Sequence, residues 1–120
     1  MDKAQAIHSF WSQFGTAFDE NTVPDDAQFP YITYNVDTGS LEDSIHLHAS
    51  LWERSTSWEN IQKLADRIAE YIGVGGVTIP CDGGYVWIVR GDPFAQRLAD
   101  DMDNVRRIYL MINVEFLTAN

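Results

Sequence analysis

The chain is short of cysteine, of basic side chains and of long apolar runs, and each shortage narrows the classes to which it can belong. Its 120 residues include one cysteine, Cys81. A single cysteine cannot close a disulfide within the chain, and no cysteine or histidine lies near it at a metal-binding spacing. A disulfide framework is therefore excluded, and we expect Cys81 to be a small strand residue.

Basic side chains are outnumbered, with 8 Lys and Arg against 18 Asp and Glu, for a formal net charge of -10. A surface that binds nucleic acid needs clustered Lys and Arg to neutralise phosphates. Specific binding of DNA or RNA is therefore not expected.

Long apolar runs are absent, and none approaches the ~18 residues that indicate a membrane span. The N-terminus carries Asp2 and Lys3 and lacks the basic start and apolar middle of a secretory signal. We therefore expect a soluble cytoplasmic protein with no membrane partner. Its length and its 45% apolar content suit one domain over residues 1–120.

Two stretches have apolar residues at helical spacing. The first, residues 3–14, has its stripe at Ile7, Phe10, Trp11 and Phe14. The second follows Thr56 and Glu59, whose spacing is that of a capping box, and it ends at Gly73. Its stripe is Ile61, Leu64, Ala65, Ile68 and Ile72. Both stretches are predicted to be helices that pack through these faces.

Five segments have strand character, with β-branched and aromatic residues in alternation. They are 31–36, 44–52, two strands around the turn Asp82-Gly83-Gly84 within 77–90, and 107–117. Pro80 places its strand at an edge of the sheet or at a bulge. The predicted fold is α+β, with two helices on a mainly antiparallel sheet of about five strands in the order α-β-β-α-β-β-β. Residues 19–30 and 91–105 are predicted to be loops.

His46 and His48 are two residues apart in the predicted strand 44–52, so their side chains share one face. Two such histidines are able to contribute to a zinc site, and a small metal-dependent enzyme is one alternative. The sequence marks no third ligand, and solvated or interface histidines are the other interpretation. No catalytic residues, metal site or cofactor are assigned.

The connection 91–105 is long for a loop in a compact domain, and such loops are usually functional. Phe94 and Leu98 are apolar, and Gln96 and Arg97 lie beside them. We predict that this segment is an arm that contacts another subunit. The predicted interface set is Phe94, Gln96, Arg97, Leu98, Arg106, Arg107, Trp52 and Trp87. Asp101 and Asp103 lack the turn glycine of a calcium loop, and Arg90-Gly91-Asp92 is too short to indicate adhesion.

Four segments in order, "VPDDAQFPYITY", "ASLWERSTSWENI", "GGVTIPCDGGYVWIVRGDPFAQR" and "RRIYLMINVEFLT", resemble the tail terminator or tail-completion proteins of long-tailed bacteriophages and their prophages. The resemblance covers nearly the whole chain. It implies a structural virion protein that is not an enzyme and that forms a hexameric ring. The ring would cap the head-proximal end of the tail tube, end tube polymerisation and join the tube to the head.

The partners that the resemblance implies are the tail tube protein, the tape-measure end and a head-side connector. The protein would lie in the virion, after assembly in the host cytoplasm. DNA would pass through the lumen of the ring without specific binding, since the chain is acidic. A neck or head-completion protein, acting as a stopper or adaptor, is the alternative function of the same class.

Overall fold

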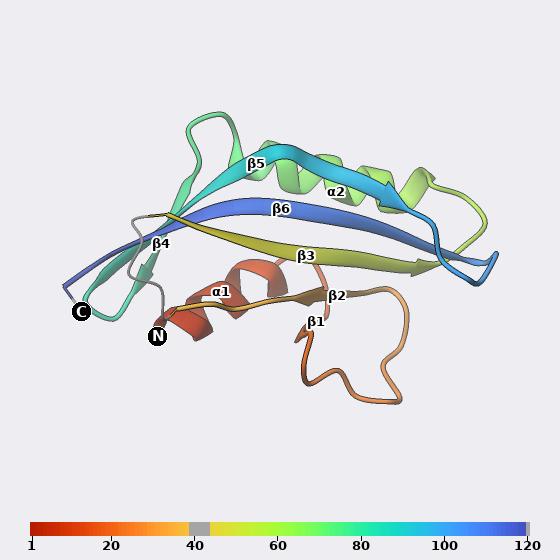
Figure 1. Ribbon diagram of the computed structural model, residues 1–120, viewed down its shortest axis with the longest axis horizontal. Coiled ribbons are helices and arrows are strands. Elements are labelled where there is room, and N and C mark those ends of the chain that lie inside the picture. Colours follow the sequence, from red (N-terminus) through yellow and green to blue (C-terminus); the bar gives the residue numbers. More distant parts are fainter. Residues whose placement is uncertain (39–43, 120) are drawn as a thin grey trace.

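The computed structural model describes residues 1–38 and 44–119 and is drawn in Figure 1. The elements are α1 (Lys3–Ser12), β1 (Ala17–Asp19), β2 (Tyr31–Tyr34), β3 (Ile45–Arg54), α2 (Glu59–Ile72), β4 (Val77–Cys81), β5 (Gly84–Leu98) and β6 (Val105–Thr118). The α+β class is confirmed. The described sheet has six strands where about five were expected, because β1 lies within a stretch that carries no alternating pattern.

The strands follow the order β1-β2-β3-β6-β5-β4 across the sheet. β1 pairs with β2 in parallel, and the four other pairings are antiparallel, as expected for most of the sheet. The predicted turn at Asp82-Gly83-Gly84 joins β4 to β5, and Pro80 lies on the edge strand β4. The long strands β3, β5 and β6 form the centre of the molecule (Figure 1).

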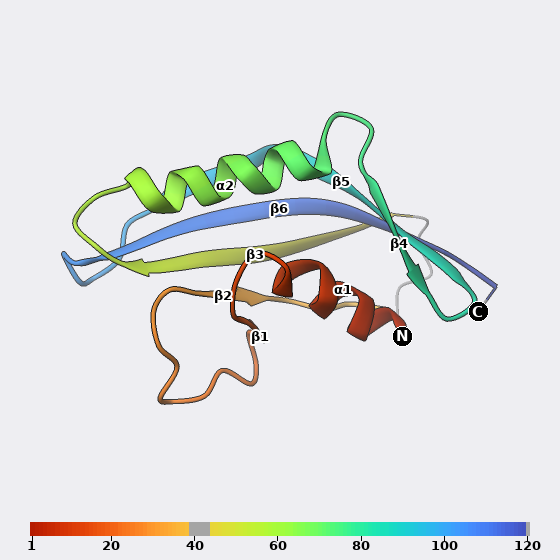
Figure 2. The ribbon, with the colours of Figure 1, turned by 180° about the vertical axis from the view of Figure 1, so that it is seen from behind.

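Both helices lie on the same side of the curled sheet (Figure 2). Their predicted apolar faces are buried, and the ring of Tyr71 on α2 contacts Phe10 and Phe14 from the first helical segment at 6.3 and 5.5 Å between centroids. The central part of the sheet side of this core is formed by the inward residues of β3 and β6: Leu47, Ala49, Leu51, Ile108, Leu110, Ile112 and Val114. This is the alternation that the sequence predicts for these strands.

The helix ends differ from the predictions in detail. α1 begins with a capping box in which Asp2 Oδ1 accepts from the Gln5 N–H at 2.7 Å. The Thr56 capping box predicted for α2 is wrong, because Ser57 Oγ accepts the Glu59 N–H instead, at 3.1 Å. α2 ends at Gly73 as predicted, where φ is 68° and a residue without Cβ is favoured.

The main prediction that the structure corrects is the loop over residues 91–105. Residues 91–98 continue β5, residues 95–98 pair with β6 again, and only 99–104 form the turn. Arg90 pairs with Ile112 and Ala95 with Leu110, so residues 91–94 bulge opposite Met111. Gly91 and Pro93 are loop signals in sequence, but here they build a bulge that lets the strand resume.

Candidate assembly surface

The sheet face opposite the helices carries no helix or strand of the described chain, and we call it the outer face (Figure 1). Residues directly paired in antiparallel strands point to the same side, so the register assigns its members. They include Tyr31, Thr33, His48, Ser50, Trp52, Trp87, Gln96, Leu98, Arg107, Tyr109, Met111 and Glu115. Large rings and polar groups dominate this face.

The rings of the outer face are in contact across strands. Tyr31 on β2 stacks on Trp52 of β3, with centroids 6.2 Å apart. The Arg107 guanidinium lies 4.7 Å from the Trp52 ring centre and 6.0 Å from that of Tyr109. Tyr109 in turn stacks on His48 at 5.4 Å. A continuous row of rings and one cation therefore crosses β2, β3 and β6.

Hydrogen bonds fix the polar ends of this row. Trp52 Nε1 donates to Thr33 Oγ1 at 3.0 Å, and Arg107 Nε donates to Ser50 Oγ at 3.0 Å. Ser50 is only 3% exposed, since these side chains cover it. Side chains that are already ordered lose less entropy when a partner binds, which suits a recognition surface.

The eight predicted interface residues fall on two sides of the sheet. Trp52, Trp87, Gln96, Leu98 and Arg107 belong to the outer face. The other three do not, because the bulge in β5 and the register of β6 turn them toward the helices.

On the helix side, Phe94 packs against the protein's own core. Arg97 and Arg106 lie over the Trp58 ring at 4.9 and 5.4 Å, and Arg97 Nε donates to Gln62 Oε1 at 3.1 Å. These contacts join the ends of β5 and β6 to the start of α2. Trp58 was missed by the sequence analysis, although a tryptophan directly before a helical stripe is a signal for packing at that helix end.

The two histidines of the alternative metal site have different partners. His46 Nδ1 is hydrogen-bonded to Asn113 Oδ1, whereas His48 Nε2 pairs with Glu20 Oε2 at 2.9 Å. Within residues 1–38 and 44–119 no group of three His, Cys, Asp or Glu side chains is arranged to hold a metal ion. The geometry that is present suits cross-strand and strand-to-loop contacts.

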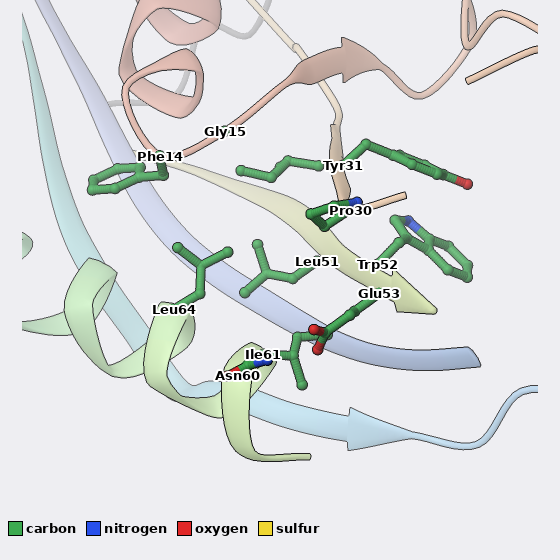
Figure 3. A pocket seen from close by; sticks show the side chains of 11 residues that line it. Phe14, Gly15, Pro30, Tyr31, Leu51, Trp52, Glu53, Asn60, Ile61 and Leu64 are labelled. Carbon is green, nitrogen blue, oxygen red and sulfur yellow. The ribbon is translucent and has the colours of Figure 1, made fainter. Parts of the chain in front are cut away.

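A small apolar cleft opens between α2, β3 and the segments at Gly15 and Pro30 (Figure 3). Its volume is about 130 Å³. The lining is Phe14, Gly15, Pro30, Tyr31, Ile32, Leu51, Trp52, Glu53, Asn60, Ile61 and Leu64. Glu53 is the one carboxylate in this lining, and sequence reasoning did not single it out.

Neither helix in the described part of the chain is both long enough and apolar enough to cross a membrane.

These features define the protein as a small α+β domain with an open, ring-rich sheet face. Its fold is similar to that of a chain in a solved structure described as the virion of a native gene transfer agent (GTA) particle. The TM-score is 0.63 and the identity 14%, over 95% of this chain and 93% of that chain. No family model matches the sequence, and no curated protein matches it. At this identity the likeness establishes the fold.

Proposed function

We propose that the protein is a structural subunit of a phage-like particle that caps the head-proximal end of the tail tube. In this role it ends tube polymerisation and forms the joint to the head-side connector. The observation that carries the proposal is the similarity of fold, over 95% of the chain, to a chain of a virion. The sequence resemblance to tail terminator proteins supports a position at the tube end.

The outer face supports the proposal because it has the composition of an interface. Aromatic residues and arginine are enriched where proteins meet, and here Tyr31, Trp52, Arg107 and Tyr109 form one contiguous row. Trp87 extends this face toward β4 and is 37% exposed. We propose this face as the surface that meets the tube or a neighbouring virion protein.

The charge supports a passage for DNA through a ring of subunits. A hexamer would multiply the net charge of -10 and repel nucleic acid from any acidic inner wall. DNA would then pass without specific binding. A solved ring whose lumen is lined by Arg and Lys would contradict this part of the proposal.

The test is light scattering on the purified chain over a concentration series, followed by addition of tail tube protein from the same particle. We expect a ring of six copies, alone or at tube ends, and tubes that stop growing when the protein is added. Charge reversal on the outer face, Arg107→Glu, should abolish the arrest while a folded circular dichroism spectrum is retained. Tubes that grow unaffected by the wild type would overturn the proposal.

A neck protein on the head side is the second candidate, since the similar chain belongs to a whole virion and its likeness fits either position. Co-purification separates the two. Capture of head-side connector protein but not of tail tube protein would favour the neck role.

A further inference from the structure

The turn between α2 and β4 presents an apolar side chain beside a cation of β5. Val74 is 94% exposed and lies between Gly73 and Gly76, both of which have positive φ. The turn stands away from the body of the molecule in both ribbon views (Figures 1 and 2). Val74 and Arg90 line the same shallow hollow. We call Val74 and Arg90 the knob.

Neither member of the knob has a visible role within its own chain. A valine exposed to this extent adds nothing to the core, and its apolar surface is available for burial by a partner. Across residues 1–38 and 44–119, the Arg90 guanidinium makes no hydrogen bond and no ion pair. The knob is therefore a free apolar group beside a free positive charge.

The cleft of Figure 3, which we call the socket, has the complementary character. Its walls are largely apolar, and its one charged lining residue is Glu53. Glu53 Oε2 is shielded from solvent and has no hydrogen-bond partner in the described part of the chain. A shielded carboxylate oxygen without a donor is costly, so a cation from outside the chain would stabilise it.

The neighbouring strand does not supply that cation. Arg106 is directly opposite Glu53 in the register of β3 and β6. Its guanidinium instead donates to the carbonyl oxygens of Thr56 and Asp103, both at 2.8 Å, and lies over the Trp58 ring. The two terminal nitrogens of Arg106 are thus held at the start of α2, its Nε is shielded without a hydrogen-bond partner among the described residues, and no hydrogen bond joins it to Glu53.

We propose that the socket of one copy receives the knob of a second copy, with Val74 in the apolar cleft and Arg90 paired with Glu53. The occupant is a side chain, since the volume of about 130 Å³ is small beside the roughly 300–1,000 Å³ of small-molecule sites. The opposite charges of Arg90 and Glu53 single out another copy of this chain.

The position of the two parts makes the contact repeat. The socket is lined by Asn60 and Ile61 in the first turns of α2, whereas Val74 of the knob follows the last residue of α2, Ile72. A contact between two different surfaces leaves one of each free and so continues to a ring or a filament. The contact would explain how subunits of the proposed ring bind one another, and its place in a ring rests on the proposed function.

The first test is sedimentation velocity of the full chain from micromolar to millimolar concentration. We expect concentration-dependent association that Val74→Asp and Glu53→Gln each weaken by about tenfold or more, as for loss of a central interface residue. Asn21→Asp, which adds the same charge as Val74→Asp on the exposed loop after β1, is the matched control and should associate as the wild type does. Circular dichroism confirms that each variant is folded.

Charge exchange tests the ion pair directly. Arg90→Glu alone and Glu53→Lys alone should each weaken association, and the double variant should restore it. If Glu53→Lys does not fold, Glu53→Gln with Arg90→Glu gives the coupling from a double-mutant cycle.

Disulfide trapping covers the case of weak association. Val74→Cys with Asn60→Cys, in a Cys81→Ser background, should give a ladder of linked copies under mild oxidation. A wild type that stays monomeric, together with a double-cysteine variant that gives no ladder, overturns the contact, and so does association that Val74→Asp leaves unchanged.

The contact and the proposed function fail in different ways. If Val74→Asp stops tube growth as the wild type does, the contact is wrong and the function stands. If the wild type does not affect tube growth while Val74→Asp weakens self-association, the function is wrong and the contact stands.

Discussion

The two faces of the sheet differ along the same strands. On β6 the inward residues Ile108, Leu110, Ile112 and Val114 are each no more than 1% exposed. The residues between them, Tyr109, Met111, Asn113 and Glu115, are half-buried and point outward. The inward side packs against helices, whereas within residues 1–38 and 44–119 the outward side contacts its own side chains and those of neighbouring strands and loops.

The difference separates stability from recognition. Aliphatic burial on the inward side supplies the favourable free energy of folding. The outward side has rings and polar groups held in place by bonds such as Trp52 to Thr33. Partial exposure there leaves area that a partner can still remove from water. Substitutions on the two sides should therefore act on different measurements.

The largest effect should come from Ile112→Ala on the inward side. Ile112 is 0% exposed, and its truncation leaves a cavity that costs about 2–5 kcal/mol in the free energy of unfolding. Met111→Ala, one residue away on the half-buried outer face, should cost about 1 kcal/mol because less apolar area is lost. Urea denaturation measures both. Equal losses would contradict the division between the faces.

A smaller effect should come from Gly91→Ala in the bulge of β5. A Cβ at Gly91 would lie 2.7 Å from the Met111 carbonyl oxygen and 2.9 Å from its Cβ. The strand would have to move apart from β6, at a cost of about 1–3 kcal/mol. Thermal unfolding measures the loss.

Gly75→Ala is the matched control for this substitution, since a Cβ there meets nothing within 4 Å and its φ is not positive. It should be neutral or stabilise by about 0.4–1 kcal/mol through the unfolded chain. If Gly91→Ala is as harmless as Gly75→Ala, the bulge is not tightly packed against β6.

The fold was predictable where the apolar residues of an element kept one spacing from end to end. The stripe of α2 and the alternation of β3 and β6 each repeat over ten or more residues, so chance patterns do not compete. β1 has three residues, too few for any period to register. The predicted strand ended at residue 90, because Gly91 and Pro93 are loop signals. Only the pairing with β6 shows that β5 resumes after the bulge.

The candidate surfaces were predictable in part. The outward position of Trp52 and Trp87 follows from alternation alone. The side on which Arg97 lies depends on the number of residues in the bulge, which no local pattern gives. The unpaired state of Glu53 is a tertiary property, because it depends on Arg106 bonding to backbone oxygens near α2.

The smallest predicted effect concerns a tyrosine on the inward side. Tyr34 is 4% exposed, and its hydroxyl is hydrogen-bonded to His8 Nδ1 at 2.6 Å. Burial, with a further contribution from the Asp19 carboxylate, raises the pKa of Tyr34 above its ordinary value of 10.0. The fold therefore favours the protonated phenol.

This preference links the stability of the fold to alkaline pH. In the unfolded chain Tyr34 loses its proton near pH 10.0, whereas in the fold its raised pKa keeps the proton on. The stabilising contribution is complete below pH 10.0 and is lost as the pH rises through the pKa of the folded state.

Tyr34→Phe removes this linkage while leaving the other tyrosines to titrate as before. The difference in free energy of unfolding between wild type and Tyr34→Phe, from urea titrations, should be constant at neutral pH and should shift against the wild type by about pH 11. A difference that stays constant over this range would mean that the inward side at Tyr34 is as open to water as the outer face.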